Sequence, residues 1–88
     1  MVTQNYDPQL HVLRSISSAL ADPRQRSEAM SARFHLFTAL ENGDEERAQD
    51  WLEALAVALR AALPSTSAGM ASAERAIAII RKGLDQTV

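Results

Sequence analysis

The chain of 88 residues has no cysteine, only three glycines and three prolines, and 5% aromatic residues. Without cysteine there is no disulfide, no thiolate metal ligand and no thiol nucleophile. With so few glycines there is no glycine-rich loop of the kind that cradles phosphate groups. No Ser-x-x-Lys or Gly-x-Ser-x-Gly pattern occurs either. We therefore expect a protein that is not an enzyme and that binds no cofactor.

The chain has neither a large net charge nor a long apolar run. The formal net charge is −2, so electrostatics does not favour nucleic acid as a partner. Arginines gather in residues 14–33 and acids in residues 41–53. No segment approaches the ~20 apolar residues of a membrane span, and residues 1–10 lack the basic and apolar regions of a signal peptide. We expect a cytoplasmic protein that contacts no membrane.

Most of the residues in the chain are strong helix formers. The most apolar stretch, residues 51–63, reads WLEALAVALRAAL and carries charge only at Glu53 and Arg60. As a helix it would be about 20 Å long, too short to cross a bilayer. It is typical of the most buried helix of a small bundle.

Start and stop signals divide the chain into four expected helices, at about 8–20, 23–42, 44–63 and 68–82. Asp7-Pro8, Asp22-Pro23 and Asp44 are typical helix starts, and the last helix is capped by Ser65 or Ser67. Gly43 and Gly83 suit left-handed caps at helix ends. The sequence predicts one all-α domain, residues 1–88, with flexible ends at 1–6 and 84–88. Its expected architecture is a small antiparallel four-helix bundle of αα-hairpins, alone or completed by a homodimer.

Apolar residues recur at helical spacing and predict the core. The expected core stripe of the first helix is Leu10, Leu13, Ile16 and Leu20. That of the second is Met30, Phe34, Phe37 and Leu40, joined by Ala29, Leu36 and Ala39. The third contributes Ala48, Leu52, Leu55, Leu59 and Ala62, and the fourth Met70, Ala73, Ile77, Ile80 and Leu84.

The third helix also carries a second apolar strip, Ala54, Val57 and Ala61, with Trp51 beside it. A helix that is apolar on two faces is normally covered on both, so this helix lies either in a central position or at a homodimer interface. The strip predicts a non-catalytic interaction module: an adaptor, a small chaperone or a regulatory partner. It would bind a partner helix or a second copy through Trp51, Ala54, Val57 and Ala61. For Trp51 itself, a place at the core edge and a role as interface anchor both remain open.

The segment around His11 resembles the H-box of histidine-kinase dimerisation domains, in which a helical histidine accepts a phosphoryl group. His11, Leu13, Arg14 and Ser15 match that motif. Val12 replaces the acid that acts there as a base, and Ile16 replaces its proline. The resemblance implies, as an alternative function, a phosphotransfer-type signalling module that uses His11. A solvent-facing histidine without chemistry is the simpler interpretation.

Two other sites are less favoured. A metal site in a helical bundle typically uses a Glu-x-x-His motif on each of two helices. Here Pro8 and Ala32, not glutamates, lie three residues before the two histidines. We expect no metal. A DNA-binding regulator is a weaker alternative, with residues 72–82 as recognition helix. There, however, two of the three basic residues lie at the helix end.

Overall fold

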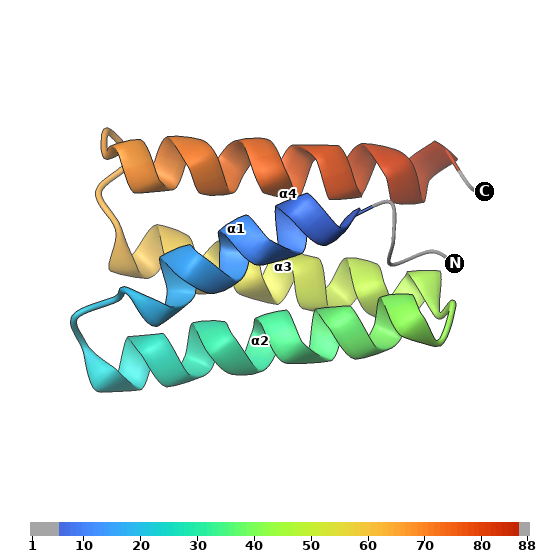
Figure 1. Cartoon of the computed structure of the whole chain (residues 1–88), viewed down its shortest axis with the longest axis horizontal. Coiled ribbons are helices and arrows are strands. Elements are labelled where there is room, and N and C mark those ends of the chain that lie inside the picture. The colour runs from blue at the N-terminus through green and yellow to red at the C-terminus, as the bar shows by residue number, and fades with distance from the viewer. Residues whose placement is uncertain (1–5, 87–88) are drawn as a thin grey trace.

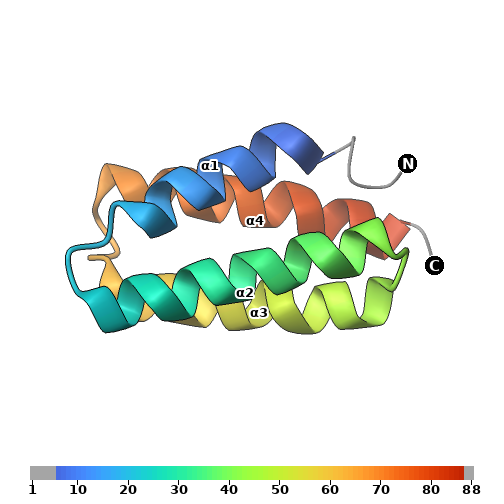
Figure 2. The same ribbon diagram turned by 60° about the horizontal axis from the view of Figure 1, so that its bottom comes forward.

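A computed structural model describes residues 6–86, which form four helices and no strand. Helix α1 spans Asp7–Ser18, α2 Pro23–Glu41, α3 Glu45–Ala62 and α4 Ala68–Gln86. Figure 1 shows the chain reversing direction at each connection, and Figure 2 shows the α1–α4 and α2–α3 pairs stacked on each other. The expected all-α class is confirmed for this part of the chain. Among these helices α2 and α3 share the most extensive contact.

The turn between α2 and α3 forms where the sequence predicts it. Gly43 has a φ of 70°, the left-handed conformation that glycine adopts most readily. The amide of Asp44 donates to the Ala39 carbonyl at 2.9 Å and the amide of Gly43 to the Leu40 carbonyl at 3.2 Å. This pair of hydrogen bonds is a Schellman motif. The Asp44 carboxylate then accepts from the amide of Arg47 at 3.2 Å and caps α3.

Asp22 caps α2 by accepting from the amides of Arg24 at 2.8 Å and Gln25 at 3.4 Å. We expect Asp22→Ala to lower the free energy of unfolding by about 1 kcal/mol, because these amides lose their acceptor. Asp50→Ala is the matched control: it removes the same charge from an exposed position within α3. Urea denaturation of both variants measures the difference. Equal stability of the two would show that the Asp22 cap contributes nothing.

The starts of α1 and α4 differ in detail from the sequence pattern. Asp7 is not a cap: Tyr6 occupies that position, without a side-chain hydrogen bond, and Asp7 lies in the first turn. There the helix dipole still favours its negative charge. At α4 the structure decides between the two serines, since the Ser67 hydroxyl accepts from the Met70 amide at 3.1 Å.

The expected helix end at Gly83 is wrong. Helix α4 continues to Gln86, and Gly43 is the one glycine with positive φ among the described residues. Gly83 instead makes room for Tyr6: a Cβ built on it would lie 2.8 Å from Cζ and 2.9 Å from Cε1 of that ring. Tyr6 and Leu84, which we expected in flexible ends, are both buried. Residues 1–5 and 87–88 lie outside the described part.

The core confirms the predicted seams of α3 and α4 and most of that of α1. Of the expected residues, only Ile16 of α1 and Ala62 of α3 are half-buried. Ser17, which no pattern predicted, is fully buried, and its hydroxyl has no hydrogen-bond partner in the described structure. The buried members of the three seams are Leu10, Leu13, Leu20, Ala48, Leu52, Leu55, Leu59, Met70, Ala73, Ile77, Ile80 and Leu84.

For α2 the prediction is confirmed at Ala29, Leu36, Ala39 and Leu40, which are buried. It is wrong at Phe34, while the half-buried Phe37 still packs against the core. Phe34 is 56% exposed, and Met30 and Phe37 are half-buried. The buried residues are Ala29, Ala32, Leu36, Ala39 and Leu40. Both sets follow helical spacing, so periodicity does not separate them. The small alanines let α3 approach closely, which explains why the bundle buries that seam and turns the larger side chains outward.

Candidate interaction surfaces

The predicted partner strip of α3 is open. Val57 is 57% exposed, Ala54 and Ala61 are exposed, and Trp51 is half-buried. No helix among residues 6–86 covers the strip, so the expected central position of the third helix is wrong. The strip is therefore a candidate contact surface.

Trp51 is held against α2 by an aromatic stack. Its ring lies 4.4 Å from that of His35, centroid to centroid, at an interplanar angle of 27°. The ring of Phe34 meets His35 edge-on at 5.8 Å and 66°. Such pairs add about 0.5–1.5 kcal/mol beyond the area they bury. The stack therefore fixes the position of Trp51 at the surface between α2 and α3. The sequence predicted only a polar face for His35 and did not predict its contact with Trp51.

An open hollow of about 410 Å³ lies between α2 and α3 beside this stack. Trp51 and Ala54 line it from α3, together with Ala58. From α2 come Ser27, Glu28, Ser31 and Ala32. Val57 and Ala61 are not part of its wall. The structure therefore brings two of the four predicted residues to the hollow and leaves the other two on the exposed surface of α3.

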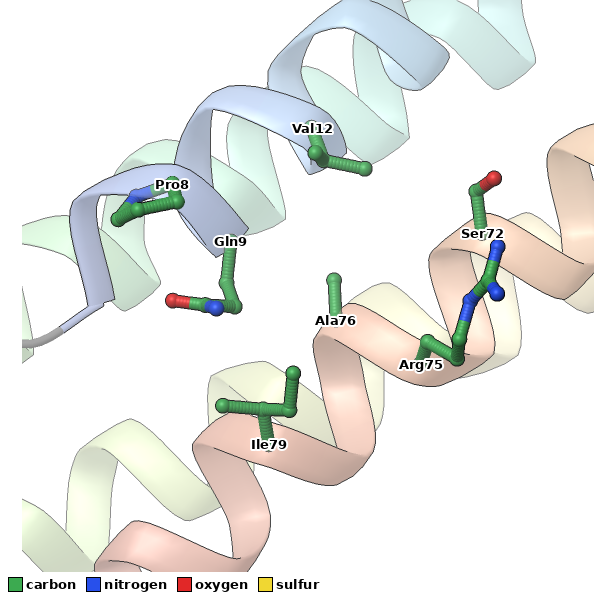
Figure 3. Close-up of a pocket in the computed structure, with 7 residues that line it drawn as sticks. All are labelled: Pro8, Gln9, Val12, Ser72, Arg75, Ala76 and Ile79. Carbon is green, nitrogen blue, oxygen red and sulfur yellow. The ribbon is translucent and has the colours of Figure 1, made fainter.

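A second groove, of about 250 Å³, separates α1 from α4. Figure 3 shows Gln9 of α1 and Ile79 of α4 turned into the gap between the helices. The Gln9 Oε1 atom is buried without a hydrogen-bond partner among the described residues, and Ile79 is 50% exposed. No sequence signal predicted this groove, because Ile79 lies off the seam of its own helix and α1 shows no second apolar strip.

Two arginines, one on α1 and one on α2, lie near enough to influence each other electrostatically. The guanidinium carbon of Arg33 lies 5.9 Å from the centroid of the Phe37 ring, and its Nε is buried without an acceptor in the described structure. Burial lowers the pKa of the Arg33 guanidinium, and the positive charge of Arg14 lowers it further. No ion pair within residues 6–86 includes either residue. Among the described residues, the positive charge of this surface has no ion-pair partner.

The other cations of the bundle are largely paired. Between α3 and α4, Arg81 contacts Glu53 at 2.9 Å and Arg60 contacts Glu74 at 3.2 Å. Exposed pairs of this kind stabilise a protein by about 0–1 kcal/mol. The pairing of Arg81 leaves the expected DNA-recognition segment, residues 72–82, with one of its three basic side chains already engaged.

Both histidines lie on the surface. His11 is exposed on α1, while Val12, at the position of the H-box acid, lines the α1–α4 groove. Within residues 6–86 no three His, Asp or Glu side chains come together in a metal-binding arrangement. The phosphotransfer alternative stays a prediction. It is tested by incubation with a phosphodonor, which should give an acid-labile label that His11→Ala removes.

Comparison of the chain with protein-family models, curated proteins and solved structures gave no match. None of the described helices is long and apolar enough to cross a membrane. The function therefore has to be inferred from the surfaces described above.

Proposed function

We propose that this antiparallel bundle is a non-catalytic interaction module that binds an amphipathic helix of a protein partner, as an adaptor, small chaperone or regulatory partner does. The observation that carries the proposal is the exposed apolar strip of α3, with Val57 57% exposed. In the alternative form of the proposal, a second copy of the chain supplies the partner surface. The cytoplasmic location expected from the sequence belongs to the same proposal.

The geometry beside the strip supports a helix as the partner. Ala54 and Ala58 have small side chains, and the hollow they line is open to solvent. A partner helix could therefore approach α3 closely and insert larger apolar residues beside Trp51. Tryptophan is enriched among the residues that dominate interface energies, and the stack on His35 fixes this one in place before binding.

A charge placed on the strip should abolish the interaction. We expect Ala61→Asp to lose the complexes that the unmodified chain forms, because the carboxylate would be buried without a partner. Ala78→Asp is the matched control, since Ala78 is also exposed but lies on α4. Affinity capture from the native host, with light scattering of the purified protein, measures both forms of the proposal.

The outcomes separate cleanly. Loss of a complex or dimer in Ala61→Asp but not in Ala78→Asp supports the strip as the contact. Recovery of the same complexes by both variants overturns the proposal. A monomer in light scattering overturns the form that relies on a second copy.

A further inference from the structure

Helix α2 carries an apolar stripe that the bundle covers only in part. Met30, Phe34 and Phe37 follow one another at spacings of four and three residues, which places them along one side of the helix. Phe34 is 56% exposed, and the other two are half-buried. This is the stripe that periodicity alone assigned to the core. Its large side chains lie at the side of α2 away from the alanine seam.

Positive charge borders this stripe on the side of α1. The guanidinium of Arg33 lies over the Phe37 ring at 5.9 Å, and Arg14 is near enough to disfavour its charge. The Nε of Arg33 is buried and lacks an acceptor among the described residues. Arg26, by contrast, is engaged: its guanidinium donates to the Leu20 carbonyl at 3.1 Å. We call Arg14, Met30, Arg33, Phe34 and Phe37 the α1–α2 face.

Glu28, the acid of α2 that is closer in sequence to Arg33, is engaged with another arginine. Glu28 pairs with Arg24 at 3.6 Å, and none of the ion pairs of the described residues reaches Arg14 or Arg33. Two neighbouring positive charges that have no ion pair among the described residues form an arrangement that an oxyanion would stabilise. A carboxylate can accept from a guanidinium in a bidentate, charge-assisted hydrogen bond.

We propose that the α1–α2 face binds an amphipathic helix of a protein partner whose apolar side carries carboxylates along one edge. The apolar side would cover Phe34 and Met30, and the carboxylates would neutralise Arg14 and Arg33. The proposal goes beyond the α3 strip, because it concerns a different face and needs neither Val57 nor Ala61. It also states the chemistry of the partner, which the α3 strip does not.

Electrostatics favours an acidic helix over two other occupants of this face, a second copy of the chain and nucleic acid. A second copy seated face to face would bring the arginine pairs of both chains into one interface, where like charges repel. Nucleic acid would have to approach a chain of net charge −2. Moreover, α2 ends beside the acids of residues 41–53, which would repel its phosphates. The partner helix meets the same net charge, but its carboxylates lie along one edge only and can face Arg14 and Arg33, whereas phosphates run along the whole length of a nucleic acid.

Two synthetic helical peptides test the proposal. Both carry a leucine stripe, bordered by glutamates in one peptide and by lysines in the other, and each is titrated into the ¹⁵N-labelled full chain by NMR. We expect the glutamate peptide to shift the amides of residues 30–37 and of Arg14. Arg14→Gln with Arg33→Gln should weaken its Kd by about tenfold, since each arginine supplies a charge-assisted contact. Arg75→Gln with Lys82→Gln, the same loss of charge on α4, should leave the Kd unchanged.

Three results would overturn the proposal. The first is equal binding of the lysine peptide, or no shifts with the glutamate peptide at millimolar concentration. The second is displacement of the glutamate peptide by a short single-stranded RNA, which would assign the face to nucleic acid. The third is a dimer of the free chain that Phe34→Ser dissociates, which would assign it to a second copy. Ala61→Asp should bind the glutamate peptide normally, so failure at the α3 strip and failure at this face are distinguishable.

Discussion

Leu36→Ala should lower the free energy of unfolding by about 2–5 kcal/mol, because it opens a cavity in the core. Leu36 is fully buried on the side of α2 that packs in the bundle. Small domains are stabilised by only about 5–15 kcal/mol in total, so this one substitution should remove a large fraction of the stability. Thermal and urea unfolding of the purified variant measure the loss.

Phe34→Ala is the matched control on the same helix. Although phenylalanine is the larger residue, Phe34 is 56% exposed, and we expect a change of less than about 1 kcal/mol, as at other surface sites. This pair of variants separates the two overlapping stripes of α2. A loss at Phe34 as large as the loss at Leu36 would show that α2 is rotated about its axis relative to the structure described here.

Gly83→Ala should destabilise the protein by about 1–2 kcal/mol, although the same change in an exposed helix interior stabilises by about 1 kcal/mol. The added methyl group would overlap with the Tyr6 ring, whose Cζ lies 2.8 Å from the Cβ position. Tyr6 is only 7% exposed, so the ring must leave the core to make room. The loss is bounded by the burial of that side chain, about 1.5–3 kcal/mol.

Two further variants isolate the cause. In a Tyr6→Ala background, Gly83→Ala should become stabilising by about 1 kcal/mol, because only the helix propensity is then left. Gly69→Ala should stabilise the unmodified chain, since a Cβ there would meet Leu63 Cδ1 at an ordinary 3.8 Å. If Gly83→Ala stabilises the protein while Tyr6 is present, the contact between the two residues does not exist in solution.

The sequence predicted those elements whose causes are local. Asp22, Gly43 and Asp44 act through hydrogen bonds and backbone angles of the nearest few residues, so their roles follow from residue type and order alone. The seams of α3 and α4 were also predictable, because each of these helices has one stripe of large aliphatic residues. The exposed α3 strip followed as surplus apolar surface. Trp51 was identified with it, although its stacking partner His35 was not.

Only the tertiary structure decided which of two equally spaced stripes α2 buries. Side-chain hydrophobicity ranks Phe34 above Ala29 and Ala32, but close approach of α3 favours the small residues and leaves the phenylalanine exposed. The sequence also did not predict contacts between segments that are distant along the chain. The sequence predicts a helix end at Gly83, whereas in the structure Gly83 makes room for Tyr6, which is distant in sequence. Arg14 and Arg33 belong to different helices, and the charge of Arg14 lowers the pKa of Arg33 only because the bundle places α1 against α2.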